Sequence, residues 1–289
     1  MKNAKIWALV LMGGGARGLA HIGVIRVLEK RGLVPDVVAG TSMGAIVGGL
    51  YAAGLSGAEL TGMLDGRGLG FAAGDGAPRR GLFRPRNLFE DLMLADYRNR
   101  VISRIGKDKG DAIEAHLAGL VGDCRIEDMP VRFVCNAVDL VSGREALFTK
   151  GRLCRALRAS MSLPLVFAPV RMGGMLLLDG GVLNSAPIEA ARALGAEIAV
   201  LVDVHRPIKR VPIGRLKSTF QIVQRTIEVA AAASFEERAR HADYVLRIPI
   251  DLGVLNFREP RRIAKKGEKA AEDHLQELLQ AIGAAGRDT

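Results

Sequence analysis

A serine lies at the centre of the segment Gly40-Thr41-Ser42-Met43-Gly44. This is the G-x-S-x-G pattern, in which a sharp turn from a strand into a helix lifts the serine oxygen away from the backbone. The neighbouring sequence has both elements, because the apolar residues 37–40 precede the turn and small apolar residues at 43–53 follow it. The start of such a helix also places a positive dipole end where a reacting oxygen becomes anionic. The segment therefore predicts that Ser42 is a nucleophile.

A second glycine-rich segment, Gly13-Gly14-Gly15-Ala16-Arg17-Gly18, follows the first apolar run of the chain. It satisfies G-x-G-x-x-G, the pattern of dinucleotide-binding loops, which also needs an acidic residue at the end of the second strand. That strand ends in Gly40-Thr41-Ser42, and Asp36 lies at its start, so the nucleotide interpretation fails. Consecutive glycines also suit an oxyanion hole, because their N–H groups can point together at a carbonyl oxygen. We predict this role for Gly13, Gly14 and Gly15, with a tight turn that binds no ligand as the alternative.

The nucleophile needs a proton acceptor, which is most often a histidine held by a carboxylate. Ser42, Asp179 and His205 occur in the chain order of an α/β-hydrolase triad. That fold places several strands before its nucleophile turn, whereas the first 42 residues here hold only two strand-like runs. The triad is therefore the weaker interpretation, since His205 is equally explained as a loop residue after the apolar run at 198–204.

Asp179-Gly180-Gly181 supplies a stronger candidate base. The carboxyl group ends the apolar run at 175–178, and the two glycines leave space for another part of the backbone to approach. Removal from water raises the pKa of a carboxyl group, which makes it a better proton acceptor. We predict that Asp179 is the partner of Ser42, with a simple Asp-Gly turn as the alternative.

These segments require an α/β framework that brings strand ends together. The apolar run at 6–12, the helix-periodic stretch at 17–31 and the extended stretch at 36–40 form a strand–helix–strand unit. Both glycine-containing loops leave the carboxyl ends of strands in this unit, where open parallel sheets bind their ligands. Further strands are expected at 131–139, 145–149, 175–178 and 198–204, and a charged amphipathic helix is expected at about 263–282.

The 289 residues are expected to form one large α/β domain. Its core motifs fall within 6–205, and residues 206–289 are expected to pack on the same domain as an extension of helix and strand. The stretch from Ser56 to about Gly81 is rich in glycine and lacks periodicity, and an amphipathic segment follows near 88–94. This region suits either a lid over the site or an ordinary surface insertion.

The formal net charge is +10, with lysine and arginine gathered at 79–109, 209–225 and 258–269. Such a charge attracts nucleic acid or phospholipid headgroups, although a solvated basic surface with no specific partner explains it equally well. The basic stretches are not interleaved with stacking aromatic residues and carry no recognition motif, so nucleic-acid binding is not expected. Peripheral contact with an anionic membrane surface stays open.

The three cysteines, Cys124, Cys135 and Cys154, form an odd set without C-x-x-C spacing. This pattern argues against a disulfide framework and a zinc site, and it favours a reducing cytoplasm. The lysines before the run at 6–12 resemble the start of a signal peptide, but the run is short and continues into glycines without a cleavage site. A buried first strand explains it better. No stretch of about 20 apolar residues occurs, so a membrane span is not expected.

Together, and in this order, the motifs resemble those of the patatin-like phospholipase family, specifically its bacterial cytoplasmic branch. Residues 13–18 are similar to the family's oxyanion loop, residues 40–44 to its nucleophile turn and residues 179–181 to its acidic motif. The block Ala159-Ser160-Met161-Ser162-Leu163-Pro164 is similar to a block of small residues and proline that the family has between the last two motifs. A strand around 242–244 and the closing helix also resemble that branch, so the resemblance covers nearly the whole chain.

The resemblance implies a three-layer α/β/α fold with a mainly parallel central sheet, and a Ser–Asp dyad without a catalytic histidine. Ser42 would then attack an ester carbonyl of a lipid and Asp179 would accept its proton, with no metal or organic cofactor. Arg17 would either fix the glycine loop or attract an anionic headgroup, and the motif glycines, including Gly18, Gly180 and Gly181, would support the site. The expected protein is a cytoplasmic lipid acyl hydrolase of phospholipase A, lysophospholipase or carboxylesterase type, and peripheral contact with the inner membrane face stays open for it.

Two other functions stay open at this point. The chain would also suit a regulatory or membrane-associated binding protein that keeps the hydrolase fold, although the intact motifs argue against an inactive enzyme. A thioesterase or acyltransferase would use the same acyl-enzyme. The residues indicate neither the headgroup nor the acyl chain of the substrate, and they leave the oligomeric state open.

Overall fold

The computed structural model describes residues 5–64, 111–164 and 166–283. Within these ranges, eight strands form one sheet in the order β5-β6-β3-β2-β1-β7-β8, with β4 paired to β3. They are β1 Trp7–Leu11, β2 Val37–Gly40, β3 Arg132–Asp139, β4 Arg144–Phe148, β5 Val170–Met172, β6 Met175–Asp179, β7 Ile198–Asp203 and β8 Tyr244–Arg247. The neighbouring strands β3, β2, β1, β7 and β8 are parallel to one another. β4 and β6 each pair antiparallel with β3, and β5 pairs antiparallel with β6. The predicted mainly parallel sheet is confirmed.

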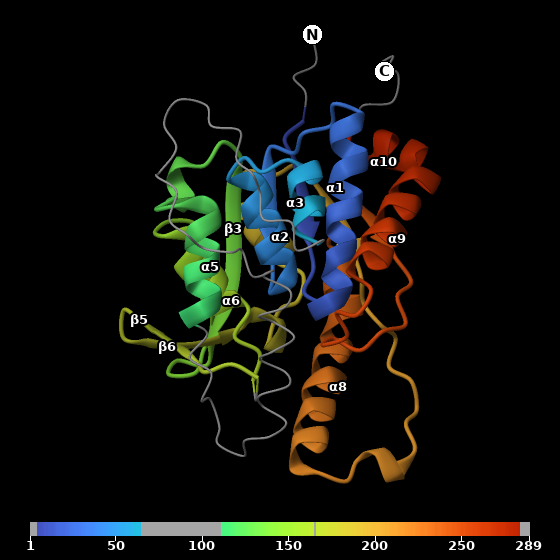
Figure 1. The fold of residues 1–289 in the computed structure, drawn as a ribbon. Helices are drawn as coiled ribbons and strands as arrows, with labels where there is room; N and C mark the ends of the chain where they lie inside the picture. The colour runs from blue at the N-terminus through green and yellow to red at the C-terminus, as the bar shows by residue number, and fades with distance from the viewer. Residues whose placement is uncertain (1–4, 65–110, 165, 284–289) are drawn as a thin grey trace.

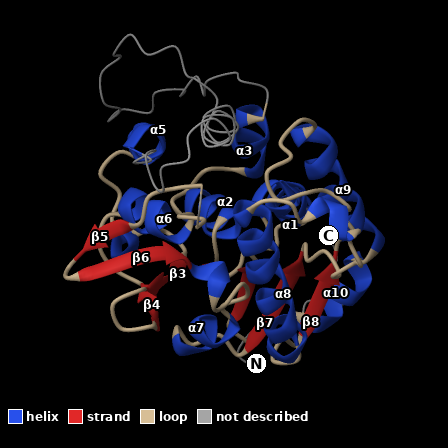
Figure 2. Cartoon of the chain, turned by 90° about the horizontal axis from the view of Figure 1, so that it is seen from below, coloured by secondary structure: helices blue, strands red, loops and turns tan. Residues whose placement is uncertain are grey.

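Helices lie on both faces of this sheet (Figure 2). α2 (Met43–Ala52) and α6 (Leu153–Ser160) contact the central strands on one face, and α7 (Ile188–Ala193) contacts β1, β2 and β7 on the other. The other described helices are α1 Ala20–Lys30, α3 Gly57–Met63, α5 Asp111–Val121, α8 Thr219–Ala239, α9 Pro260–Asp273 and α10 Leu275–Ala281, with 3₁₀ turns η1 Gly15–Leu19, η2 Ile126–Asp128, η3 Gly180–Val182 and η4 Ile213–Arg215. The layered α/β fold expected from the sequence is therefore present.

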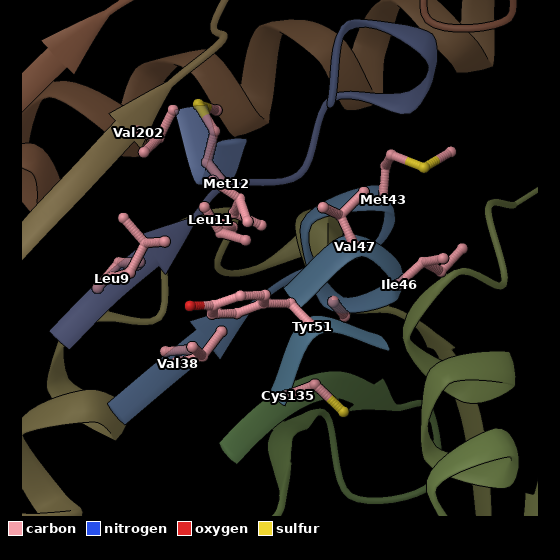
Figure 3. Packing of buried hydrophobic residues seen from close by; sticks show 14 of the residues in the cluster. Leu9, Leu11, Met12, Val38, Met43, Ile46, Val47, Tyr51, Cys135 and Val202 are labelled. Carbon is pink, nitrogen blue, oxygen red and sulfur yellow. The ribbon is translucent and has the colours of Figure 1, made fainter. Parts of the chain in front are cut away.

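The central strands are apolar along their length because both of their faces are covered. Every residue of β1, β2 and β7 is buried, and so is every residue of α2. Figure 3 shows Val47 and Tyr51 of α2 beside Leu11 and Val38 of the first two strands. Small residues let this helix approach closely, since an added Cβ at Gly48 would lie 2.8 Å from Val38 Cγ1. The packing of α2 on these strands fixes the turn that precedes the helix.

The stretch from Ser56 to Gly81, for which the sequence suits a lid or a surface insertion, begins with the short helix α3. Ser56 Oγ accepts a hydrogen bond from the N–H of Glu59, and the Glu59 carboxylate accepts one from the N–H of Ser56. This reciprocal capping starts a short helix that has no apolar periodicity to reveal it. The rest of the stretch to Gly81, and the amphipathic segment near 88–94, lie outside the described residues.

The expected closing helix is divided into α9 and α10, which are separated at His274. α9 lies side by side with α1 (Figure 1). Their crossing is close, because an added Cβ at Gly23 would lie 2.0 Å from Ala264 O, and one at Gly267 would lie 1.9 Å from Ala20 O. Glycine at both positions lets the two backbones touch. α9 therefore packs tightly against α1, the helix that follows the first glycine loop.

Residues beyond 205 continue the same sheet, because β8 pairs in parallel with β7. α8 and the segment that leads into it extend past the carboxyl ends of the central strands (Figure 1). Among the residues that the structure describes, each helix is either too short or too polar to span a lipid bilayer. The projecting α8 is the element of this part of the chain that borders the candidate site.

Candidate active site

Ser42 lies at the tip of the turn between β2 and α2, where the backbone is strained. Its φ and ψ angles are 55° and −122°, and no other non-glycine residue in the described ranges has a positive φ. Such a conformation costs of order 1–3 kcal/mol and persists only where the surrounding structure enforces it. An added Cβ at Gly44 would lie 2.0 Å from Leu11 O, and one at Gly40 would lie 2.5 Å from Gly44 O. The two motif glycines are therefore required by close approach of the backbone.

Strand register brings Asp179 level with Ser42. Gly40 of β2 pairs with Cys135 of β3, and Ala137 of β3 pairs with Asp179 at the end of β6. Ser42 lies two residues beyond Gly40, and Ala137 lies two residues beyond Cys135. The two side chains consequently meet across β3, where Ser42 Oγ donates a hydrogen bond to Asp179 Oδ2 at 2.6 Å. The structure thus brings together the two residues on which the sequence-based prediction depends.

Asp179 is almost fully buried, with 3% of its surface exposed. Burial raises the pKa of Asp179 to about 6, although hydrogen bonds from Ser42 and from the N–H of Gly181 act in the opposite direction. The N–H of Gly181 donates to Asp179 Oδ1 at 2.8 Å and so orients the carboxylate. At Gly180 an added Cβ would lie 2.3 Å from Asn136 Oδ1. A carboxylate with this pKa is ionised at neutral pH and accepts a proton better than an exposed aspartate.

The glycine loop at 13–18 lines the same cavity as the dyad. The N–H of Gly13 donates to Ser185 O at 2.9 Å, so it is already engaged within the protein. Among the hydrogen bonds of the described residues, none uses the N–H groups of Gly14 or Gly15. In this conformation the donors available from the three predicted glycines are therefore those of Gly14 and Gly15.

Contacts with a distant segment hold the glycine loop in shape. The N–H of Ala16 donates to Val254 O at 2.7 Å, and Arg17 Nε donates to Gly14 O at 3.2 Å. Gly15 has a φ of 55°, and an added Cβ there would lie 2.1 Å from the same Val254 oxygen. Burial lowers the pKa of Arg17 to about 10, so the guanidinium stays cationic at neutral pH where it lines the cavity. The bond to Gly14 fits the first of the two roles expected for Arg17, which is to fix the loop.

Two further contacts hold the nucleophile turn. The N–H of Ser42 donates to Ser160 Oγ at 2.9 Å, and Ser160 is completely buried at the end of α6. Gly18 packs against the start of α2, where an added Cβ would lie 2.6 Å from Met43 Cγ. Sequence reasoning missed this contact of Ser160, although the residue lies in the block at 159–164 that carries part of the family resemblance.

A buried polar cluster behind the dyad was also missed. Thr41 Oγ1 donates to Asn136 Oδ1 at 2.8 Å, and Asn136 Nδ2 donates to Asn184 O at 2.8 Å. Glu145 Oε1 accepts from Asn136 Nδ2 at 2.6 Å and from Asn184 Nδ2 at 3.0 Å. The cluster joins the residue before Ser42 to β3, the strand that pairs with β6. An asparagine inside an apolar strand is the signal that locates it, because a buried amide needs partners.

His205 lies near the dyad without joining it. The residue lines the cavity, and its ring stacks on Phe235 with the ring centroids 4.8 Å apart. Burial lowers the pKa of His205, and its backbone N–H donates to Asp203 Oδ1 at 2.6 Å. The two carboxylate oxygens of Asp179 instead accept from the nucleophile and from a backbone N–H. The geometry favours the dyad over the histidine triad.

A cavity of about 200 Å³ opens at the dyad. One wall carries Ser42, Asp179 and the glycine loop, and the other consists of α8 with parts of the segments at 205–211 and 252–255. Apolar side chains dominate its lining, among them Leu163, Ile227 and Leu255. Over the described ranges, no three His, Cys, Asp or Glu side chains gather in a group suited to a metal ion. The arrangement joins a serine and a base to an apolar space.

Gly44→Ala is expected to destabilise the fold by about 3 kcal/mol, because the added methyl group would overlap Leu11 O at 2.0 Å. Gly62→Ala is the matched control, since Gly62 also lies in a helix but no atom of the described residues lies within 4 Å of the added Cβ. There the substitution is expected to be neutral or to stabilise by up to about 1 kcal/mol. Equilibrium unfolding in urea measures both variants. Equal effects would contradict the close packing of the nucleophile turn.

Known proteins match this chain over most of its length. The family model for patatin-like phospholipase matches residues 9–192. The lysophospholipase NTE1 of Candida albicans is 29% identical over 289 residues, or 92% of this chain, and that of Emericella nidulans is 31% identical over 294 residues, or 93% of this chain. The matches cover 20% and 18% of those two proteins, so this chain spans about a fifth of the length of these two relatives.

A solved structure supports the fold alone. VipD from Legionella pneumophila superposes with a TM-score of 0.50 at 16% sequence identity, covering 95% of this chain and 67% of that one. The family assignment depends instead on the sequence match, which includes the glycine loop, the nucleophile turn and the acidic motif. On this basis, the chain belongs to the patatin-like phospholipase family.

Proposed function

We propose that this protein is a serine acyl hydrolase that cleaves lipid esters through a Ser42–Asp179 dyad. The observation that carries the proposal is the 2.6 Å hydrogen bond from Ser42 Oγ to the buried Asp179 carboxylate, at the wall of an apolar cavity. Membership of the patatin-like phospholipase family supports the reaction class. The names of the fungal relatives, which are lysophospholipases, support a lipid ester as the substrate.

Acylation begins when Ser42 Oγ attacks the ester carbonyl carbon and Asp179 Oδ2 accepts the hydroxyl proton. The carbonyl oxygen becomes an oxyanion, to which the N–H groups of Gly14 and Gly15 donate. One such donor is typically worth about 10²–10³-fold in kcat. The tetrahedral intermediate then expels the alcohol, which takes its proton from Asp179, and the acyl group stays on Ser42.

Water releases the acyl group by the same chemistry. Asp179 accepts a proton from the water whose oxygen attacks the acyl-enzyme carbonyl, and that proton passes to Ser42 Oγ when the acyl bond breaks. The product is a free carboxylic acid. The start of α2 follows Ser42 directly, so its positive dipole end stabilises the anionic intermediate in both steps.

The cavity supports a substrate with an apolar acyl chain. Its lining is mainly apolar between the dyad and α8, so the acyl part of an ester would lie there out of water. Arg17 offers a positive charge at the glycine loop for an anionic headgroup, while its Nε holds Gly14 O. The proposed substrate class therefore includes phospholipids and lysophospholipids.

A fluorophosphonate probe followed by substrate profiling tests the proposal. The probe is expected to label one residue, Ser42, identified by mass spectrometry of the digested protein. A panel of phospholipid, lysophospholipid, short-chain ester and acyl thioester is expected to show fastest cleavage of a lipid ester. Preference for the thioester would favour a thioesterase. Full biological complementation by the Ser42→Ala protein would favour a binding role.

The rate of hydrolysis is expected to depend on pH through Asp179. The carboxyl group must be ionised to accept the Ser42 proton, and burial raises its pKa to about 6. We expect kcat/KM to rise about tenfold per pH unit below that value and to stay level above it. Measuring the profile with a soluble ester, between about pH 4.5 and pH 8.5, checks this expectation. A rate that is level down to the acid limit would contradict Asp179 as the base.

A further inference from the structure

Residues 206–229 form a projecting segment beside the cavity, called the 206–229 arm below. The arm consists of chain that follows β7, the turn η4 and the first half of α8. It extends past the carboxyl ends of the central strands, the edge of the sheet at which the nucleophile turn lies (Figure 1). Several of its residues, including Ile208 and Gln224, line the cavity that contains Ser42. The arm therefore connects the cavity to the outer surface of the protein.

The arm exposes large apolar side chains to solvent. Ile213 is 90% exposed, and Ile222, Val229 and Ile208 are 50%, 46% and 42% exposed. These are four of the nine exposed large apolar residues in the described ranges, and they fall within one short segment. Single exposed apolar residues are ordinary, but a group of them beside a site marks an interaction surface.

One side of α8 carries part of this apolar group. Ile222 and Val229 are seven residues apart, so they lie on the same side of the helix. The residues of α8 that line the cavity, such as Gln224 and Glu228, lie at other helical positions. The helix thus covers the cavity with one side and presents apolar side chains to the exterior with another.

The arm is also strongly basic. It contains six basic residues and one acidic residue, a net +5 of the formal +10 of the chain. The six are Arg206, Lys209, Arg210, Arg215, Lys217 and Arg225. Arg206 and Lys209 share a single carboxylate, that of Asp251, at 2.8 and 2.9 Å. Arg210 and Lys217 are exposed. The arm therefore combines exposed apolar residues with an excess of positive charge.

We propose that the 206–229 arm docks on an anionic phospholipid bilayer. Apolar side chains placed among basic residues are the composition of segments that bind such surfaces, because the former enter the headgroup region and the latter meet the lipid phosphates. Docking in this way turns the cavity toward the lipid, so that an ester reaches Ser42 from the membrane. The inference rests on the proposed function, since a lipid ester hydrolase has to reach substrate held in a bilayer.

Vesicle sedimentation tests the docking, with Ser42→Ala as the background so that the lipid stays intact. Binding is expected to vesicles of phosphatidylcholine mixed with phosphatidylglycerol, and about tenfold weaker binding is expected to phosphatidylcholine alone. The pair Ile213→Asp and Ile222→Asp is expected to weaken binding by about tenfold or more. The pair Arg210→Gln and Lys217→Gln is expected to weaken it by about fivefold per charge, and less at high salt.

Matched controls come from the loop between α1 and β2, at the opposite end of the strands. Val34 is 58% exposed and Arg31 is also exposed, so Val34→Asp and Arg31→Gln change the same chemistry away from the arm. Both variants are expected to bind vesicles as the unchanged protein does. Ile213→Trp adds a direct readout, because its emission should shift to the blue on docking. Trp7, the only tryptophan of the sequence, is buried and gives a constant background.

Hydrolysis of a soluble short-chain ester separates docking from catalysis. The arm variants are expected to keep that rate within about twofold, because none of the four changed residues lines the cavity. Their hydrolysis of phospholipid in anionic vesicles is expected to fall together with binding. Wild-type binding by the Ile213→Asp, Ile222→Asp protein would overturn the docking proposal and leave the proposed function intact.

Two further outcomes separate the docking surface from the proposed function and from self-association. A wild-type protein that binds vesicles but hydrolyses no ester would overturn the proposed function while supporting the docking surface. Sedimentation velocity without lipid examines a second copy of the chain as the alternative occupant of the arm. Self-association that Ile213→Asp and Ile222→Asp abolish, with no binding to vesicles, would overturn the membrane assignment.

Discussion

Ser42→Ala is expected to lower kcat/KM for ester hydrolysis by about 10⁴-fold or more, because the substitution removes the oxygen that forms the acyl-enzyme. The oxygen donates the 2.6 Å hydrogen bond to Asp179 and lines the cavity. The activity that remains would come from water that attacks an ester carbonyl polarised by the oxyanion donors. Steady-state assays with a soluble ester and with a lysophospholipid measure the loss, and the variant should take no fluorophosphonate label.

Ser42→Gly is the control that separates lost chemistry from a disturbed turn. At a φ of 55° and a ψ of −122°, an alanine Cβ is strained, whereas glycine adopts such angles freely. Both variants should be inactive, yet Ser42→Gly is expected to be about 1 kcal/mol more stable than Ser42→Ala in urea unfolding. A correctly folded Ser42→Ala protein with the activity of the wild type would refute Ser42 as the nucleophile.

Asp179→Asn is expected to lower kcat/KM by about 10⁴-fold while stabilising the fold at neutral pH. An asparagine amide fits the site, since Oδ1 still accepts from the N–H of Gly181 and Nδ2 donates to Ser42 Oγ. That donation leaves Ser42 with no acceptor for its proton. Burial raises the pKa of Asp179 from 3.8 to about 6, so the ionised form costs the folded state up to about 3 kcal/mol. Kinetic assays and urea unfolding measure the two effects.

The raised pKa of Asp179 also fixes how the free energy of unfolding changes with pH. The folded protein binds the Asp179 proton more tightly than the unfolded chain does, so its stability falls as pH rises from about 4 to about 6. The stability gained in the Asp179→Asn variant should therefore be complete above about pH 6 and absent near pH 4.

Asp203→Asn is the matched control, because burial also raises the pKa of Asp203 to about 6 but its carboxylate accepts from His205 and Arg247. It is expected to keep kcat/KM within about threefold. An equal loss of activity in both variants would contradict a special role for Asp179.

The nucleophile turn and the glycine loop could be predicted because their signals are local. The run of buried residues in β1, the glycines of both loops and the helix after Ser42 are all encoded within about fifty consecutive positions. Parallel strands then place the two loops at one edge of the sheet, as the strand–helix–strand pattern predicts. This much of the fold follows from residues that are neighbours in the chain.

The geometry around Asp179 depends on partners that are distant in the chain. The apolar run predicts a strand that ends in a carboxylate, but not that β6 runs antiparallel to β3 and pairs Asp179 with Ala137. Ser160 Oγ accepts a hydrogen bond from the N–H of Ser42, which is 118 positions away in the chain. Likewise, the carbonyl oxygen of Ser185 accepts one from the N–H of Gly13. Such pairings are set by how the sheet and helices pack, and one sequence carries no local signal for them.

The contact of Ala16 with Val254 has a consequence for how the protein is made. The family model ends at 192, and every group of the proposed dyad and oxyanion hole precedes residue 180. Yet the carbonyl oxygen that accepts the Ala16 hydrogen bond in the glycine loop belongs to Val254, and α9 packs closely against α1 at Gly267. A growing chain on the ribosome thus carries serine and base long before it acquires the residues that complete their surroundings. The proposed hydrolase is therefore expected to become active only after Val254 and Gly267 have left the ribosome and packed against the glycine loop and α1.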